Sequence, residues 1–197
     1  SYIITRFLLW KKERILQVFG GIGLVLLLWT FGYFGTSVYS WFGNVFDLSE
    51  YRGLDATAYL ENVFSEDAGA IRWLDETIEG QPVVLEANGD SYSDYERVSA
   101  MTGLPTVLGW YVHEWLWRGD PADLNVRAED VKQMYTSTDT NEVLRLLEQY
   151  HVIYIFVGSK EKEKYGDALN ESLLQSIGDI VYQDTASGTY ILQVQNT

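Results

Sequence analysis

The chain contains no cysteine, only two histidines and only 14 lysine and arginine residues among 197. Without cysteine it can form neither a disulfide nor a thiolate metal site. It also lacks a signal-peptide layout, because no small-residue cleavage site follows its first basic residues. There is no GxGxxG motif, no P-loop lysine, no internal repeat and no low-complexity tract, so we predict no cofactor.

The charge is divided unevenly along the chain. Residues 1–46 contain four basic residues and one acidic residue. Residues 47–197 contain 10 basic and 27 acidic residues, which gives this part a net charge of −17. An acidic domain repels phosphate backbones, so we predict no nucleic-acid partner.

A run of 32 residues between Arg14 and Asp47 carries no charge. As a helix, residues 15–38 alone would span about 36 Å, and a bilayer core needs about 30 Å. The five glycines within residues 15–38 would weaken a soluble helix, but in a membrane they let neighbouring helices approach closely. We therefore predict a transmembrane helix over residues 15–42. Its expected contacts are membrane lipid and other transmembrane helices, from the same longer chain or from partner subunits.

The basic cluster Lys11-Lys12-Glu13-Arg14 precedes this apolar run. Because positive residues stay on the cytoplasmic side, we expect a cytoplasmic N-terminus and an extracytoplasmic acidic domain in a cell-membrane protein. Residues 1–14 form a basic cytoplasmic or interfacial segment. Residues 1–10 are apolar as well and look like the tail of an earlier membrane helix, so we expect the chain to be part of a longer protein.

After a linker over residues 43–67, the pattern of residues 68–197 alternates between helices and strands. Helical spacing of apolar residues predicts helices over 68–78, 128–135, 141–150 and 169–177. Short apolar runs predict strands over 83–87, 106–108, 152–157, 180–183 and 189–194. The last two flank Ser187-Gly188, a hairpin signal. The prediction is therefore an extracytoplasmic α/β domain, Rossmann-like, with a C-terminal β-hairpin.

The densest set of chemically active side chains lies in residues 102–119, TGLPTVLGWYVHEWLWRG. Aromatic faces stack on the C–H faces of sugars, and charged groups nearby exchange hydrogen bonds with hydroxyls. The candidate substrate-binding residues here are Trp110, His113, Glu114, Trp117 and Arg118. The alternative is that the tryptophans pack the domain against the membrane surface. We predict no metal site, since neighbouring helical residues point apart and HExxW lacks the second histidine of HExxH.

The loop after the first strand, residues 86–95, is a second candidate. Open α/β sheets bind ligands at the carboxyl ends of their strands, and Glu86 and Tyr92 follow such an end. The alternative is a solvated turn around Asn88-Gly89. No residue of the chain is assigned a catalytic role.

Several segments resemble the C-terminal part of the YYY family, polytopic membrane proteins of archaea and Chloroflexi-type bacteria. They are GLDATAYL at 53–60, AIRWL at 70–74, the segment 82–119, VRAEDVKQMY at 126–135 and YHVIYIFVGSKEKEKY at 150–165. That family is similar to the GT-C class of glycosyltransferases, which take sugars from polyprenyl-phosphate donors at the outer membrane face. The resemblance implies a C-terminal anchor and outer domain of such an enzyme. It places the catalytic carboxylate near the N-terminal membrane helices, outside this chain.

Two other functions fit the same sequence. The chain could be a non-catalytic single-span subunit that docks onto a larger membrane complex. It could also be an extracytoplasmic module that binds a sugar or a lipid head group without chemistry.

Overall fold

The computed structural model of the chain describes residues 2–9, 13–44, 47–49 and 60–195. It divides into two compact units, Ser1–Asp55 and Ala56–Thr197. The division follows the composition, because the first unit holds the uncharged run and the second holds almost all of the acidic residues.

The first unit is a pair of helices, α1 (Tyr2–Leu8) and α2 (Arg14–Phe42). A side chain at Gly20 would collide with the backbone of Leu8, and one at Gly23 would press on Ile4. The two helices therefore pack antiparallel through glycines, as expected for closely packed helices. Lys11 and Lys12 of the predicted basic cluster lie outside the described residues.

Among the described residues, α2 is the helix long and apolar enough to cross a membrane. Its 29 residues correspond to about 44 Å at 1.5 Å per residue. Large apolar side chains are exposed along its length, and only Gly20 is buried. The hydroxyls of Thr30 and Thr36 donate to carbonyls of the preceding turn, so they need no water. The helix covers residues 15–42, for which the sequence predicts a transmembrane span, and the span itself stays a prediction.

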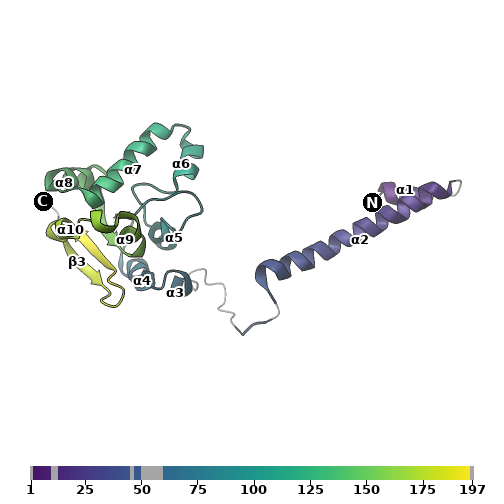
Figure 1. The fold of residues 1–197 in the computed structure, drawn as a ribbon, viewed down its shortest axis with the longest axis horizontal. Coiled ribbons are helices and arrows are strands. Elements are labelled where there is room, and N and C mark those ends of the chain that lie inside the picture. The colour runs from purple at the N-terminus through teal and green to yellow at the C-terminus, as the bar shows by residue number, and fades with distance from the viewer. Residues whose placement is uncertain (1, 10–12, 45–46, 50–59, 196–197) are drawn as a thin grey trace. The chain divides into compact units, whose positions relative to one another are not determined.

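The second unit is an α/β domain, which confirms the predicted fold class (Figure 1). Its helices are α3 (Leu60–Val63), α4 (Ala68–Thr77), α5 (Arg97–Thr102), α6 (Tyr111–Arg118), α7 (Pro121–Thr136), α8 (Thr140–Gln149), α9 (Ser159–Tyr165) and α10 (Glu171–Ile177), with a 3-10 turn at Gly166–Ala168. Its strands are β1 (Val83–Leu85), β2 (Val152–Val157), β3 (Gly178–Gln183) and β4 (Tyr190–Val194).

The four strands form one mixed sheet in the order β1-β2-β4-β3. Strands β1 and β2 are parallel, while β4 pairs antiparallel with both β2 and β3. The predicted hairpin around Ser187-Gly188 is therefore the β3–β4 pair. The predicted strand over 106–108 is reduced to a single bridge from Thr106 to Val84, because the chain turns away immediately afterwards.

The sheet separates two hydrophobic cores, because alternate residues of a strand point to opposite faces. Ile155 and Val157 of β2 lie in one core, together with buried residues of α7, α8 and α10. Phe156, between them, lies in the other core with residues of α3, α4 and α5. Leu60 and Phe64 belong to this second core, so the folded domain begins before Ala68, where the sequence pattern placed its start.

Candidate functional site

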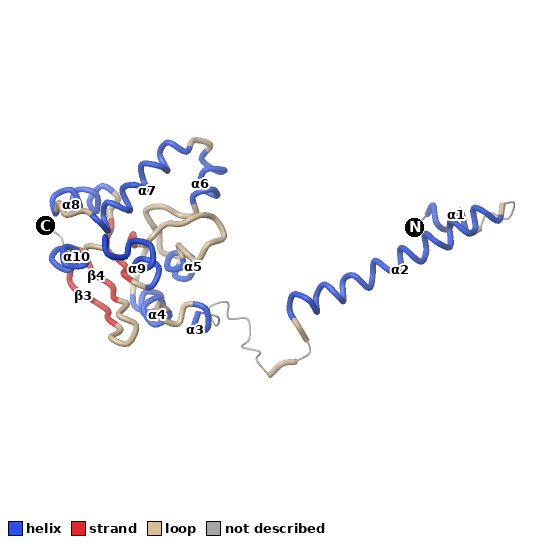
Figure 2. Tube along the Cα trace, viewed as in Figure 1, coloured by secondary structure: helices blue, strands red, loops and turns tan. Residues whose placement is uncertain are grey.

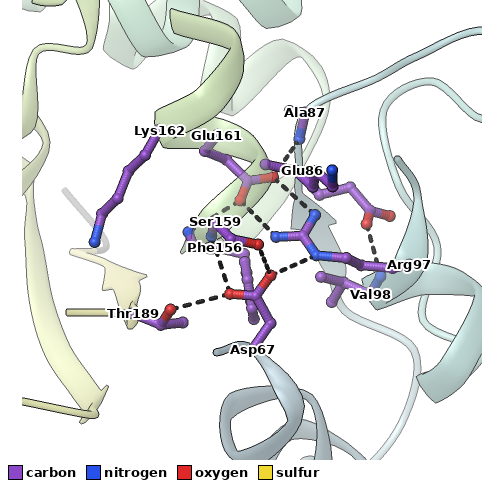
Figure 3. A network of polar contacts seen from close by, with 12 residues as sticks. Asp67, Glu86, Ala87, Arg97, Val98, Phe156, Ser159, Glu161, Lys162 and Thr189 are labelled. Carbon is purple, nitrogen blue, oxygen red and sulfur yellow. Dashed lines mark hydrogen bonds and ion pairs between the residues drawn. The ribbon is translucent and has the colours of Figure 1, made fainter. Parts of the chain in front are cut away.

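The carboxyl ends of the parallel strands β1 and β2, where an open α/β sheet binds ligands, are filled by a side chain of the protein itself. Glu161 of α9 accepts hydrogen bonds from the backbone N–H of Ala87, just after β1, and of Gly158, just after β2, both at 2.9 Å. Figure 3 shows this carboxylate inside the network that closes the sheet edge. Glu161 therefore uses the backbone N–H groups at the place where open α/β sheets bind ligands.

Arg97 at the start of α5 lies between two buried carboxylates (Figure 3). Its Nε is 2.7 Å from Oδ2 of Asp67, and its Nη2 is 2.9 Å from Oε2 of Glu161. The guanidinium also lies 5.2 Å from the centre of the Phe156 ring. All three charged side chains are almost inaccessible to solvent. A buried charge is tolerated only when it is paired and hydrogen-bonded, and this arrangement meets that condition.

Asp67 joins the network to two further elements. It accepts hydrogen bonds from the backbone N–H and the hydroxyl of Ser159, and from the hydroxyl of Thr189 at 3.0 Å. Burial alone would raise the pKa of Asp67, but Arg97 and the hydrogen bonds from Ser159 outweigh it and keep that pKa lowered. The partners of Asp67 are therefore all groups of the domain itself, and the network connects the start of α4 with α5, α9 and the β3–β4 hairpin.

This network was not predicted from the sequence. Asp67 falls in the predicted linker, and Arg97 and Glu161 carry no motif known to bind ligands. One signal was present, since Gly158 and Glu161 have the spacing of a helix N-terminus in which the third helical residue reaches back to the capping residue. That signal would have predicted the start of α9, although not the ion pair.

Glu86, one of the predicted site residues, lies beneath the surface. Its two carboxylate oxygens accept the backbone N–H of Val98 at 2.8 Å and of Ser99 at 3.0 Å, at the start of α5. Burial raises the pKa of Glu86 to about 7, and these hydrogen bonds limit the rise. Its contacts therefore serve the placement of α5.

Glu96 closes the same loop and is also buried. Its Oε1 accepts the N–H of Gly89 at 2.6 Å, while its Oε2 has no hydrogen-bond partner among the described residues. Burial is the main reason that the pKa of Glu96 rises to about 8, and the nearby Glu86 adds to the rise. Figure 2 shows the long loops that flank α5 on both sides. Glu96 fixes one of them.

Three rings come together where this loop meets α6. The ring centroids of Tyr92 and His113 lie 5.0 Å apart, those of Trp110 and His113 lie 5.2 Å apart, and those of Tyr92 and Trp110 lie 5.5 Å apart. The ring of Trp110 is held in place because its Nε1 donates a hydrogen bond to the carbonyl of Tyr95. The backbone N–H of His113 donates to the hydroxyl of Ser91. The structure thus combines the two predicted candidate regions in one aromatic cluster.

Two features of the aromatic cluster are typical of a binding surface. Tyr92 is 84% exposed. Its backbone has a φ of 62°, a left-handed conformation that is uncommon for a bulky residue. Nδ1 of His113 is buried and has no hydrogen-bond partner among the described residues. Strained backbone and unsatisfied polar atoms both concentrate at functional sites, so this cluster is the best candidate site of the domain.

Glu114 and Arg118 stand beside the aromatic cluster on α6 as an i,i+4 ion pair. Nε of Arg118 is 2.7 Å from Oε2 of Glu114, whose other oxygen accepts the N–H of Gly109 at 2.6 Å. Arg118 is half exposed, so its remaining donors face solvent. Trp117, the last predicted residue, is 87% exposed and lies outside the ring contacts of the cluster.

No group of three or more His, Asp or Glu side chains within the described part of the chain could hold a metal ion. The sequence matches no known family profile and no curated protein. Among solved structures, it is similar to the C-terminal globular domain of an oligosaccharyltransferase from Archaeoglobus fulgidus. That likeness has a TM-score of 0.41 and 13% identity, and it covers 64% of this chain and 95% of that one. It is a distant likeness in fold, and membership of the YYY family stays a prediction.

Proposed function

We propose that this chain is the membrane anchor and outer domain of a GT-C-like integral membrane glycosyltransferase that uses a lipid-linked sugar. The observation that carries the proposal is the cluster of the exposed Tyr92 with the half-buried Trp110 and His113. It lies beside the Glu114–Arg118 pair, in a chain that also has a helix of bilayer length. Supporting it is the resemblance of residues 82–119 to the YYY family.

The geometry suits recognition of a sugar. The ring of Tyr92 offers an open face for the C–H side of a hexose, and Glu114 and Arg118 offer an acceptor and donors for its hydroxyls. Arg118 can also grip a phosphate with two parallel hydrogen bonds. In this proposal the reacting carboxylate is supplied from outside the chain, and the domain holds the sugar at the extracytoplasmic face.

The test is binding of a polyprenyl-phosphate hexose to the full chain in lipid nanodiscs, compared with polyprenyl phosphate that lacks the sugar. We expect the sugar to strengthen binding, and Tyr92→Ala and His113→Ala to remove that gain with a loss of about tenfold, or 1.4 kcal/mol. Val126→Ala is the control, because it removes an exposed apolar side chain of α7 that lies outside both the cluster and α6. Equal binding with and without the sugar would contradict the proposal.

A second function is favoured by α2. Gly21, Gly32 and Gly35 have open space where a side chain would lie, and an apolar groove along Val25, Trp29, Gly32 and Tyr33 follows one helix face. Such a face fits another transmembrane helix, as in a single-span subunit docked onto a larger complex. The intact mass of the natively purified protein separates the two functions. A mass well above 22.5 kDa supports the glycosyltransferase, and a mass near 22.5 kDa with co-purifying chains supports the subunit.

A further inference from the structure

The last turn of α6 exposes three consecutive apolar side chains. Trp115 is 43% exposed, Leu116 is 72% exposed and Trp117 is 87% exposed. We call these three residues the α6 tip. Successive residues of a helix point about 100° apart, so the three side chains fan out over roughly 200°. The tip therefore projects from the domain on several sides, unlike a helix that presents one stripe to a partner.

This geometry favours a fluid apolar surrounding over a protein groove. A groove covers one face of a helix, whereas lipid can surround a projecting end on every open side. Tryptophan and leucine at the edge of a helix are also the residues that enter the boundary between lipid head groups and acyl chains. Arg118, which pairs with Glu114, follows the tip and is half exposed, so an inserted tip would bring this cation close to the lipid phosphates.

The length of the chain keeps the tip near a bilayer. Between Phe42 at the end of α2 and Leu60 at the start of α3 there are 17 residues, which reach at most about 60 Å when fully extended. A domain tethered this closely meets the membrane at a high effective concentration, so even a weak apolar contact is populated.

We infer that the α6 tip inserts into the interfacial region of the bilayer and docks the outer domain on lipid. This inference rests on the proposed anchoring of the chain by α2. The three tip residues are distinct from the aromatic cluster, so lipid contact leaves Tyr92 free to meet a sugar. Because residues 47–197 carry a net charge of −17, the docking is expected to weaken in anionic membranes.

The experiment uses the absence of cysteine in the chain, which allows one fluorescent label to be placed without background. The full chain carrying Leu116→Cys is labelled with nitrobenzoxadiazole and reconstituted in phosphatidylcholine vesicles that contain a nitroxide-labelled lipid as quencher. Ala186→Cys, in the exposed β3–β4 loop, is the control in the same domain. Figure 1 shows α6 and the β3–β4 hairpin at opposite ends of the domain. Phe31→Cys, exposed in the middle of α2, reports on the anchor.

We expect strong quenching at position 116, at a depth of about 5–10 Å below the head-group surface, and little quenching at position 186. Replacing a third of the lipid with phosphatidylglycerol should reduce the quenching at 116 only. If position 31 is quenched and 116 behaves like 186, the docking is overturned while the anchor stands. Absence of quenching at 31 would instead overturn the anchor, and with it the proposed function. If the label at position 116 is shielded in native membranes but not in lipid vesicles, the tip contacts a protein partner, and the inference is overturned.

Discussion

Two regions of the outer domain depart in opposite ways from the usual arrangement of charged residues outside and apolar residues inside. At the carboxyl ends of β1 and β2, an arginine and two carboxylates are enclosed, while at the end of α6 two tryptophans and a leucine face solvent. The enclosed charges satisfy one another and the surrounding backbone, whereas the side chains of the α6 tip make no hydrogen bond or ring contact with other described residues. Buried charges that satisfy one another make a fold sensitive to the loss of any one partner, and exposed apolar groups indicate an interaction surface.

Arg97→Met tests the enclosed charges with the largest expected effect. The substitution keeps most of the side-chain volume but leaves Asp67 and Glu161 buried without their cation. Removing one partner of a buried pair costs about 3–5 kcal/mol, so we expect a loss of this size in the free energy of unfolding. Urea unfolding of the full chain in detergent measures it. The control is Arg145→Met, which removes an exposed pair with Glu142 and should cost about 0–1 kcal/mol. Equal losses would mean that the buried network is not structural.

Gly158→Ala tests the same region with a smaller change. A methyl group at Gly158 would run into the Asp67 carboxylate and the Phe156 ring, both of which are held in place by the network and the core. Overpacking of this kind costs about 1–3 kcal/mol. Gly69→Ala is the matched control, because its new methyl would meet only the movable hydroxyl of Tyr182, and alanine favours helix α4. A neutral Gly158→Ala would show that the network can shift.

The sequence predicted the regular parts of this fold better than its connections. The strand at Val152–Val157 and the final hairpin follow directly from apolar runs bounded by glycine, because both signals are local. The short helices α3, α5 and α9 were missed because long-range contacts, such as Glu86 with the start of α5, hold them in place. The aromatic cluster was predicted as two separate segments. Their meeting depends on how the loop after β1 folds back onto α6, which no spacing in the sequence encodes.

Glu96→Gln tests how a buried carboxyl makes the stability of the domain depend on pH. The pKa of Glu96 is about 8 in the folded chain against an ordinary 4.5, so between these values the folded state binds more protons than the unfolded state. Ionisation of Glu96 therefore lowers the free energy of unfolding as pH rises from about 4.5 to 8. The variant lacks that loss and should be more stable than the parent at pH 8.5, with a difference that shrinks towards pH 4.5. Thermal unfolding across this pH range measures it, and a difference independent of pH would contradict the assignment.

Leu116→Ala should have the smallest effect on stability. Its side chain is 72% exposed, so in detergent the free energy of unfolding should change by no more than about 0.5 kcal/mol. Leu146→Ala, in the core between α8 and the sheet, provides the contrast and should cost about 2–5 kcal/mol. If Leu116→Ala costs more than about 1 kcal/mol in detergent, the α6 tip belongs to the fold like Leu146. A neutral result means that the leucine stabilises nothing within the domain, and its contribution must then be sought in contact with lipid.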